Sequence, residues 1–134
     1  MKVVNGIPLV ILCLFLTACH QLNNIPEQRP EAHKGIIDLQ DWDFEKNGPV
    51  HLIGEWAFFW DELLTPDQLK NQDEAPFVAV PEVWTNYEIE GQKMTTEGYA
   101  TYVLTVRVPD PDHTYGLYTK GQGSAYALWV DGRL

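Results

Sequence analysis

Hydrophobic and polar residues alternate with a period of two in two stretches of the chain. Residues 50–60 carry Val50, Leu52, Gly54, Trp56, Phe58 and Trp60 on one face, and residues 99–108 carry Ala100, Tyr102, Leu104, Val106 and Val108. This period is typical of β-strands that bury one face. The apolar run Phe58-Phe59-Trp60 occupies both faces, so we expect 50–60 to be a central strand. We also expect Trp56, Phe58 and Tyr102 to be buried.

Shorter apolar runs predict four more strands, at 36–39, 77–80, 115–119 and 125–130. Thr65-Pro66-Asp67-Gln68 has the pattern of a capping box with proline at the first helical position, which predicts a short helix over 66–71. Residues 82–98 lack a period and predict a long loop. Six strands and one short helix favour an all-β fold, with a β-sandwich as the expected architecture.

The last predicted strand, 125–130, is followed by Asp131-Gly132, a strong hairpin signal. A returning strand is expected after such a turn, and an unpaired apolar strand exposes an edge that recruits other chains. The alternative is that 125–130 pairs on its other side and the turn is a frayed end. We favour the first interpretation, in which residues 35–134 form a sandwich domain that is incomplete at its C-terminus.

The first 18 residues have the layout of a bacterial secretory signal. Lys2 precedes a 12-residue apolar run over 7–18, which ends in Leu16-Thr17-Ala18 directly before Cys19. The run is about 18 Å long as a helix, against about 30 Å for a bilayer core. Its end resembles a lipobox, which implies that Cys19 becomes the lipidated first residue. An uncleaved signal anchor is the alternative. Residues 19–34 are polar, with Pro26 and Pro30, and predict a tether.

The net charge limits the kinds of molecule that the chain can bind, and the cysteine positions limit its disulfides. The formal charge is -10, and loss of Lys2 with the signal would make it -11, which disfavours nucleic acid and anionic headgroups. Cys13 lies in the signal and Cys19 at its end, so the mature domain is expected to have no disulfide. Its stability must then come from an apolar core.

No catalytic, cofactor or metal motif is found. None of the four histidines has a partner at metal-ligand spacing. Asp41, Asp43 and Glu45 alternate as calcium ligands do, but Lys46 stands where an EF-hand loop needs glycine, so a solvated turn with Trp42 and Phe44 pointing inward is favoured. We expect no enzymatic activity from these residues and no bound cofactor or metal.

The five tryptophans suggest one binding hypothesis. Aromatic faces stack on sugars, but the alternating Trp56 and Trp60 are better explained as core. Trp84, Asn86 and Tyr87 lie in the predicted loop 82–98, and loops carry binding residues disproportionately. These three residues are the candidate contacts for a small carbohydrate.

Several segments, in order, resemble one known family. They are Ile36–Leu39, Trp42–Phe44, Gly54–Trp60 with Leu63–Pro66, Val80-Pro81 with Trp84, Gly98–Tyr102 and Ala125–Gly132. The order resembles the extracytoplasmic sensor region of bacterial seven-transmembrane receptors with diverse intracellular signalling modules. It is also similar to the sugar-binding domain that opens family 2 glycoside hydrolases. Glu82 departs from the family pattern, which has small residues there.

The resemblance implies a galactose-binding-like jelly roll that serves as a ligand-binding input domain of a membrane-associated receptor. It would lie in the cell envelope, on the periplasmic face of a bacterial membrane, held by the lipid or by the signal anchor. The alternatives are the non-catalytic N-terminal domain of a family 2 glycoside hydrolase and a stand-alone structural lipoprotein.

The first prediction concerns Cys19. Acyl chains contribute about 0.8 kcal/mol per buried CH₂, so a processed, acylated Cys19 would hold the chain on the membrane. We expect Cys19→Ser to stall processing or to release the domain, measured by intact mass and membrane fractionation. A wild-type mature protein that still begins at Met1 would contradict the lipobox.

Overall fold

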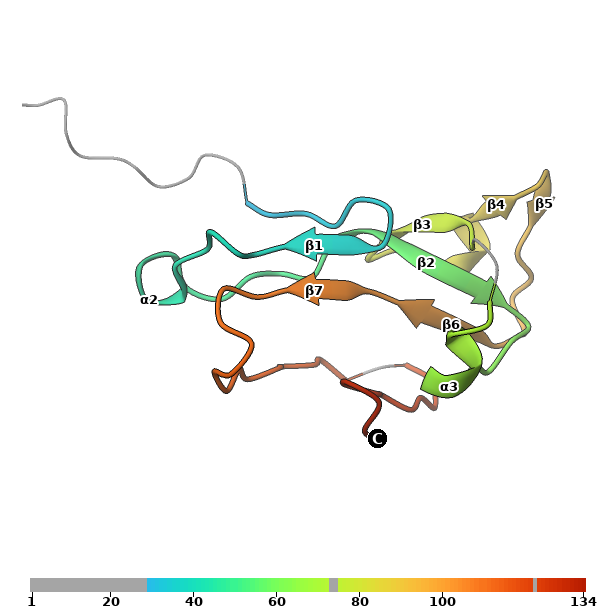
Figure 1. Ribbon diagram of the computed structural model, residues 1–134. Helices are drawn as coiled ribbons and strands as arrows, with labels where there is room; N and C mark the ends of the chain where they lie inside the picture. Colours follow the sequence, from blue (N-terminus) through green and yellow to red (C-terminus); the bar gives the residue numbers. More distant parts are fainter. Residues whose placement is uncertain (1–28, 73–74, 122) are drawn as a thin grey trace, which may run out of the picture.

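The computed structural model describes residues 29–72, 75–121 and 123–134 (Figure 1). The predicted signal, Cys19 and the first part of the tether, residues 19–28, lie outside these ranges. Across the described ranges, no helix combines the length and the apolar character needed to cross a bilayer. The described chain is β-rich, with two short α-helical turns and one 3₁₀ turn.

The central sheet has three strands in the order β3-β2-β6. Strand β2 (Gly54–Trp60) pairs antiparallel with β3 (Phe77–Val80) on one side and with β6 (Ala100–Val103) on the other. The central position predicted for residues 50–60 is confirmed, although the strand begins at Gly54 and not at Val50. Facing pairs on the even-numbered side of β2 include Trp56 with Val78 and Phe58 with Tyr102.

A second pair of strands extends from this sheet. Strand β1 (Ile36–Asp38) runs parallel to β7 (Thr105–Arg107), and only Leu104 separates β7 from β6. The alternating stretch 99–108 is therefore two strands and not one, because its first half pairs with β2 and its second half with β1 (Figure 1). Val106 is also more exposed than the alternating pattern suggests, at 38%.

A close backbone contact connects the start of the described chain to β2. Ala32 donates its N–H to the Ile53 carbonyl (2.7 Å), and its carbonyl accepts from the Glu55 N–H (2.8 Å). Gly54 lies between these bonds with φ +112°, and a side chain there would collide with the Ala32 backbone. Glycine is required here for both reasons. The buried Ala32 also shows that the fold begins before Gly35, within the predicted tether.

Side-chain hydrogen bonds at their N-termini stabilise the two short α-helical turns. Helix α3 (Pro66–Leu69) has the predicted capping box, in which Gln68 Oε1 accepts from the N–H and the hydroxyl of Thr65, both at 2.8 Å. It ends two residues before the predicted Asn71. Helix α2 (Phe44–Asn47) was not predicted; the Asp43 carboxylate accepts from the Glu45 and Lys46 N–H groups at its start.

The predicted loop 82–98 contains regular structure. It holds a 3₁₀ turn, η1 (Trp84–Asn86), and a small hairpin of β4 (Glu88–Ile89) and β5 (Gln92–Lys93). The hairpin turn is Glu90-Gly91, both with positive φ. Sequence reasoning missed it because glutamate is an unusual residue in that conformation, where asparagine, aspartate or glycine is expected.

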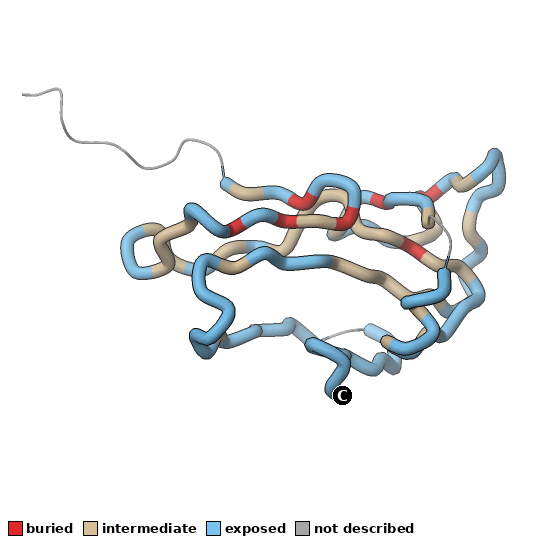
Figure 2. The backbone as a smooth tube through the Cα atoms, viewed as in Figure 1, coloured by how far each residue is buried: buried red, intermediate tan, exposed pale blue. Residues whose placement is uncertain are grey.

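The strands predicted at 115–119 and 125–130 are wrong for this structure. Within the described part of this region, the backbone pairing is an isolated bridge between Val130 and Arg133. The Asp131-Gly132 turn itself is confirmed, since both residues have positive φ and Val130 and Arg133 exchange two hydrogen bonds. Alternation of apolar and polar residues gives a strand only where a neighbouring strand completes the backbone hydrogen-bond ladder. Figure 2 shows this C-terminal run as almost wholly exposed.

The core consists of two clusters. The first contains Ala32, Ile37 and Leu39, and Trp42 and Phe44 pack against it as predicted. The second contains Phe58, Val78 and Tyr87, with partly buried neighbours Trp60, Val80, Trp84, Ile89, Met94, Ala100 and Tyr102. Phe58 has no exposed surface, as predicted, whereas Trp56 and Tyr102 are only half-buried.

We predict that Phe58→Ala lowers the free energy of unfolding by about 3–5 kcal/mol, because a fully buried phenyl ring leaves a cavity. Urea denaturation followed by tryptophan fluorescence measures this. The matched control is Leu63→Ala, whose side chain is 70% exposed and should cost little. Equal losses in the two variants would show that Phe58 does not occupy the core.

Candidate functional site

The candidate site is the segment 82–87, which we call the Trp84 loop. It follows β3 directly after a cis Val80-Pro81 peptide bond. Two backbone hydrogen bonds close η1 inside it: the Asn86 N–H donates to the Val83 carbonyl and the Tyr87 N–H to the Trp84 carbonyl, both at 2.9 Å. The loop therefore has a defined backbone shape.

Trp84 is held by another tryptophan. Its indole meets that of Trp60 nearly edge to face, with centroids 5.6 Å apart and planes at 73°. Trp60 in turn packs over Gly98, where a side chain would collide with the indole ring. Trp84 is half-buried, so part of its ring stays open to solvent in a fixed position. A fixed, partly exposed indole is suited to stacking on an apolar ring face.

Tyr87 belongs to the core and not to the contact surface. It is 6% exposed, its ring lies edge-on to Phe58 at 5.3 Å, and its hydroxyl donates to the Ala79 carbonyl at 2.7 Å. The sequence-based choice of Tyr87 as a ligand contact is therefore corrected. Its structural role is to fasten the end of the Trp84 loop to the sheet.

Burial raises the pKa of the Tyr87 phenol above its usual range, and the neighbouring Tyr102 and Glu82 act in the same direction. The phenol is thus neutral at every pH at which the domain is expected to work. This fits a group whose hydroxyl must donate to a backbone carbonyl.

Glu82 and Asn86 form the polar part of the loop. Glu82 Oε1 accepts from the Val83 N–H and from Asn86 Nδ2, both at 2.8 Å, and both side chains are exposed. These two hydrogen bonds hold the pKa of Glu82 below its usual range, so the carboxylate is ionised at neutral pH. Asn86 is exposed, and its role as a ligand contact stays a prediction. The sequence did not lead us to predict Glu82 as a ligand contact. Its position four residues before Asn86, across a short turn, could have indicated the hydrogen bond between them.

The loop thus presents a partly exposed indole, a carboxylate and an amide. Hydroxyl groups can donate to the carboxylate and accept from the amide, while a sugar ring can lie on the indole. In the described ranges, no three histidine, cysteine or acidic side chains gather as metal ligands do. Residues 41–45 have the alternating acids of a calcium loop, but Asp43 caps α2 and forms an ion pair with Lys46.

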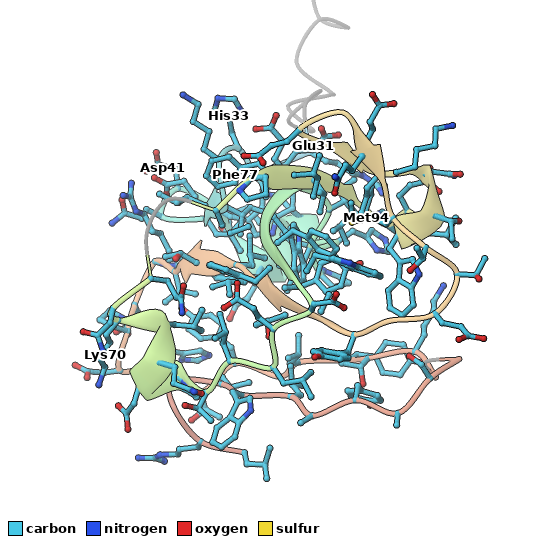
Figure 3. All side chains as sticks on the ribbon, turned by 90° about the vertical axis from the view of Figure 1, so that its right-hand side faces the viewer. Glu31, His33, Asp41, Lys70, Phe77 and Met94 are labelled. Carbon is cyan, nitrogen blue, oxygen red and sulfur yellow. The ribbon has the colours of Figure 1, made fainter. Side chains whose placement is uncertain are left out.

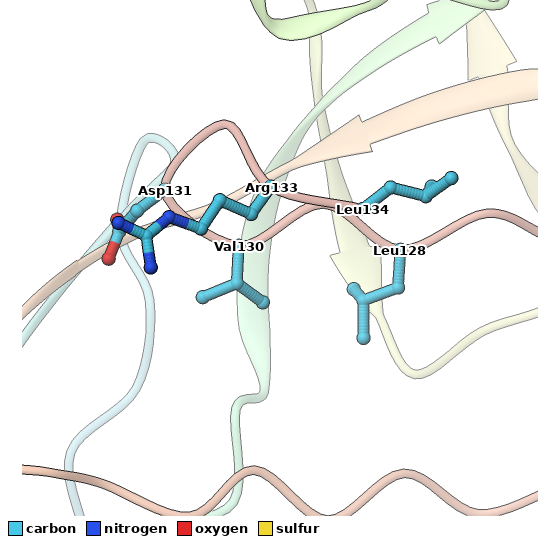
Figure 4. A pocket seen from close by; sticks show the side chains of 5 residues that line it. All are labelled: Leu128, Val130, Asp131, Arg133 and Leu134. Carbon is cyan, nitrogen blue, oxygen red and sulfur yellow. The ribbon is translucent and has the colours of Figure 1, made fainter.

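Two open cavities lie away from the Trp84 loop, next to the C-terminal turn. One, of about 530 Å³, is lined by Leu128, Val130, Asp131, Arg133 and Leu134 (Figure 4). The other, of about 470 Å³, lies between α3 and the Asp131-Gly132 turn. Sequence reasoning nominated neither, because it placed residues 125–130 in a strand.

No family model matches the chain, and no significant match was found among curated proteins or solved structures.

We predict that Tyr87 makes the stability of the fold sensitive to alkaline pH. Because its pKa is raised on folding, its contribution is complete below the unfolded tyrosine pKa of about 10 and is lost as the pH rises above that value. Urea denaturation between about pH 8 and about pH 11 should show a steeper loss of stability for the wild type than for Tyr87→Phe. Identical pH profiles would contradict the burial of this phenol.

Proposed function

We propose that this chain is an extracytoplasmic ligand-binding input domain of a membrane-associated bacterial signalling receptor. It binds a small carbohydrate through the Trp84 loop and is not itself an enzyme. The single observation that carries the proposal is the loop geometry: a partly exposed Trp84, fixed by Trp60, stands in the same short turn as the ionised Glu82 and its partner Asn86. Preorganised aromatic and polar groups of this kind reduce the entropy cost of binding a ligand.

The fold class and two predictions from the sequence also support the receptor function. The β-rich fold is compatible with a galactose-binding-like jelly roll, which is the finer architecture that we propose. The sequence segments between Ile36 and Gly132 follow one another in the order that resembles the sensor family. The predicted lipobox at Cys19 supports a location on the periplasmic face of the envelope, with the membrane as one partner.

The same loop also fits the second candidate, the non-catalytic N-terminal domain of a family 2 glycoside hydrolase. The two candidates differ in what the domain controls and not in how the loop would bind. A stand-alone structural lipoprotein, the third alternative, would need no such preorganised polar loop.

We predict weak saccharide binding that depends on Trp84. One stacked ring and a few exposed hydrogen bonds support an affinity of about 1 mM, or roughly -4 kcal/mol. Glycan-array screening of the full chain, followed by calorimetry, should show binding that Trp84→Ala abolishes. The aromatic control is Tyr118→Ala, because Tyr118 is 85% exposed and lies outside the loop.

Two results would contradict the proposal. Saccharide binding that is unchanged in Trp84→Ala would remove the site. Measurable turnover of an aryl glycoside by the purified chain would remove the non-enzymatic function, since we expect no hydrolysis at all.

A further inference from the structure

An open groove lies between α3 and the C-terminal turn. It measures about 470 Å³ and is lined by Thr65, Pro66, Asp67, Lys70, Trp129, Asp131 and Gly132. This volume falls in the range typical of small-molecule sites, roughly 300–1,000 Å³. Trp129 supplies the one aromatic surface of the lining and is 40% exposed.

The polar side of this groove is an ion pair. Lys70 Nζ lies 2.7 Å from Asp67 Oδ1, and both side chains are largely exposed. The second carboxylate oxygen and the other ammonium protons face solvent beside that bond. An adjacent acceptor and donor match two neighbouring hydroxyl groups, because each hydroxyl can donate to the carboxylate and accept from the ammonium.

Local hydrogen bonds define the backbone shape of each wall of the groove. On one side, the Thr65–Gln68 capping box fixes the turn of α3 that carries Asp67 and Lys70. On the other, two hydrogen bonds of 2.9 and 3.0 Å between Val130 and Arg133 fix the turn that carries Asp131. The tryptophan and the ion pair line the same groove.

The charges restrict the ligand. The hydrogen bond between Asp67 and Lys70 lowers the pKa of the aspartate and raises that of the lysine, so both are charged at neutral pH. Asp131 adds a second carboxylate to the lining. A groove with two carboxylates and one ammonium disfavours an anionic ligand.

We propose that this groove binds a neutral saccharide, which stacks one ring face on Trp129 and presents two adjacent hydroxyl groups to the Asp67–Lys70 pair. This is a site separate from the Trp84 loop, and it does not depend on that loop. Figure 3 shows Lys70 on the opposite side of the molecule from Met94, which packs with Trp84 around the second core cluster.

The indole N–H signals of the five tryptophans test the site. We would titrate the ¹⁵N-labelled 134-residue chain, in detergent micelles, with methyl α-D-mannopyranoside and methyl α-D-galactopyranoside. The Trp129 signal, assigned from Trp129→Phe, should shift and saturate at millimolar concentration, with a Kd on the order of 1–10 mM. Tetrahydropyran-2-methanol, which has the ring but no adjacent hydroxyl pair, should leave the signal unshifted.

The ion pair is tested by substitutions matched to a second pair. Lys70→Met and Asp67→Asn should each weaken the Trp129 response, by roughly three- to tenfold in Kd, because each removes one charge-assisted hydrogen bond. The control variants are Lys46→Met and Asp43→Asn, which alter an exposed pair of the same i,i+3 spacing outside the groove and should leave Kd unchanged. Retention of the dispersed indole signals verifies that each variant is folded.

The outcomes separate the two proposals. A shift of the Trp84 signal alone would overturn the groove and leave the Trp84 loop as the binding site. A response of neither tryptophan up to about 50 mM glycoside would overturn both sites. Equal weakening by Lys46→Met and Lys70→Met would show that the effect is one of overall charge, and would also overturn the groove.

Discussion

The packing around Phe58 determines both the central sheet and the position of the candidate site. Its ring lies 4.9 Å from that of Tyr102 on β6 and 5.3 Å from that of Tyr87 at the end of the Trp84 loop. The same side chain therefore joins β2 to its neighbouring strand and to the segment that crosses over the sheet. Aromatic pairs at these separations add specific geometry to the area they bury. Trp60 and Trp84 extend this packing outward until an indole reaches solvent.

The two candidate binding sites differ in how they are held in the fold. The Trp84 loop is connected to the core by Tyr87 and by Trp60, so its shape depends on the same contacts as the sheet. The groove beside α3 depends instead on short-range bonds, those of the capping box and of the Asp131-Gly132 turn.

Local chemistry was sufficient to predict many elements. The alternation of residues 50–60 located the central strand, the capping box located α3, and Asp131-Gly132 located the turn. The sequence was less informative where the partner of a segment decides its structure. Residues 125–130 have the period of a strand but no ladder, and residues 99–108 divide between two partners. Trp84 and Asn86 were placed in the loop correctly, whereas the burial of Tyr87 depends on its contact with Phe58, which lies 29 positions away in the sequence.

The contact between Ala32 and Gly54 has a mechanical consequence. The chain enters the fold through Ala32 and continues at once into hydrogen bonds with Ile53 and Glu55, followed by that of Gly35 with Glu55 at 3.0 Å. Tension applied along the chain ahead of Ala32 would thus be transmitted directly to the central strand, and along the axis of β2 it would strain these three bonds together. Because Gly54 has no side chain, its backbone lies directly against that of Ala32. Force applied at Ala32 would therefore reach β2 and the aromatic core with little extension of the chain.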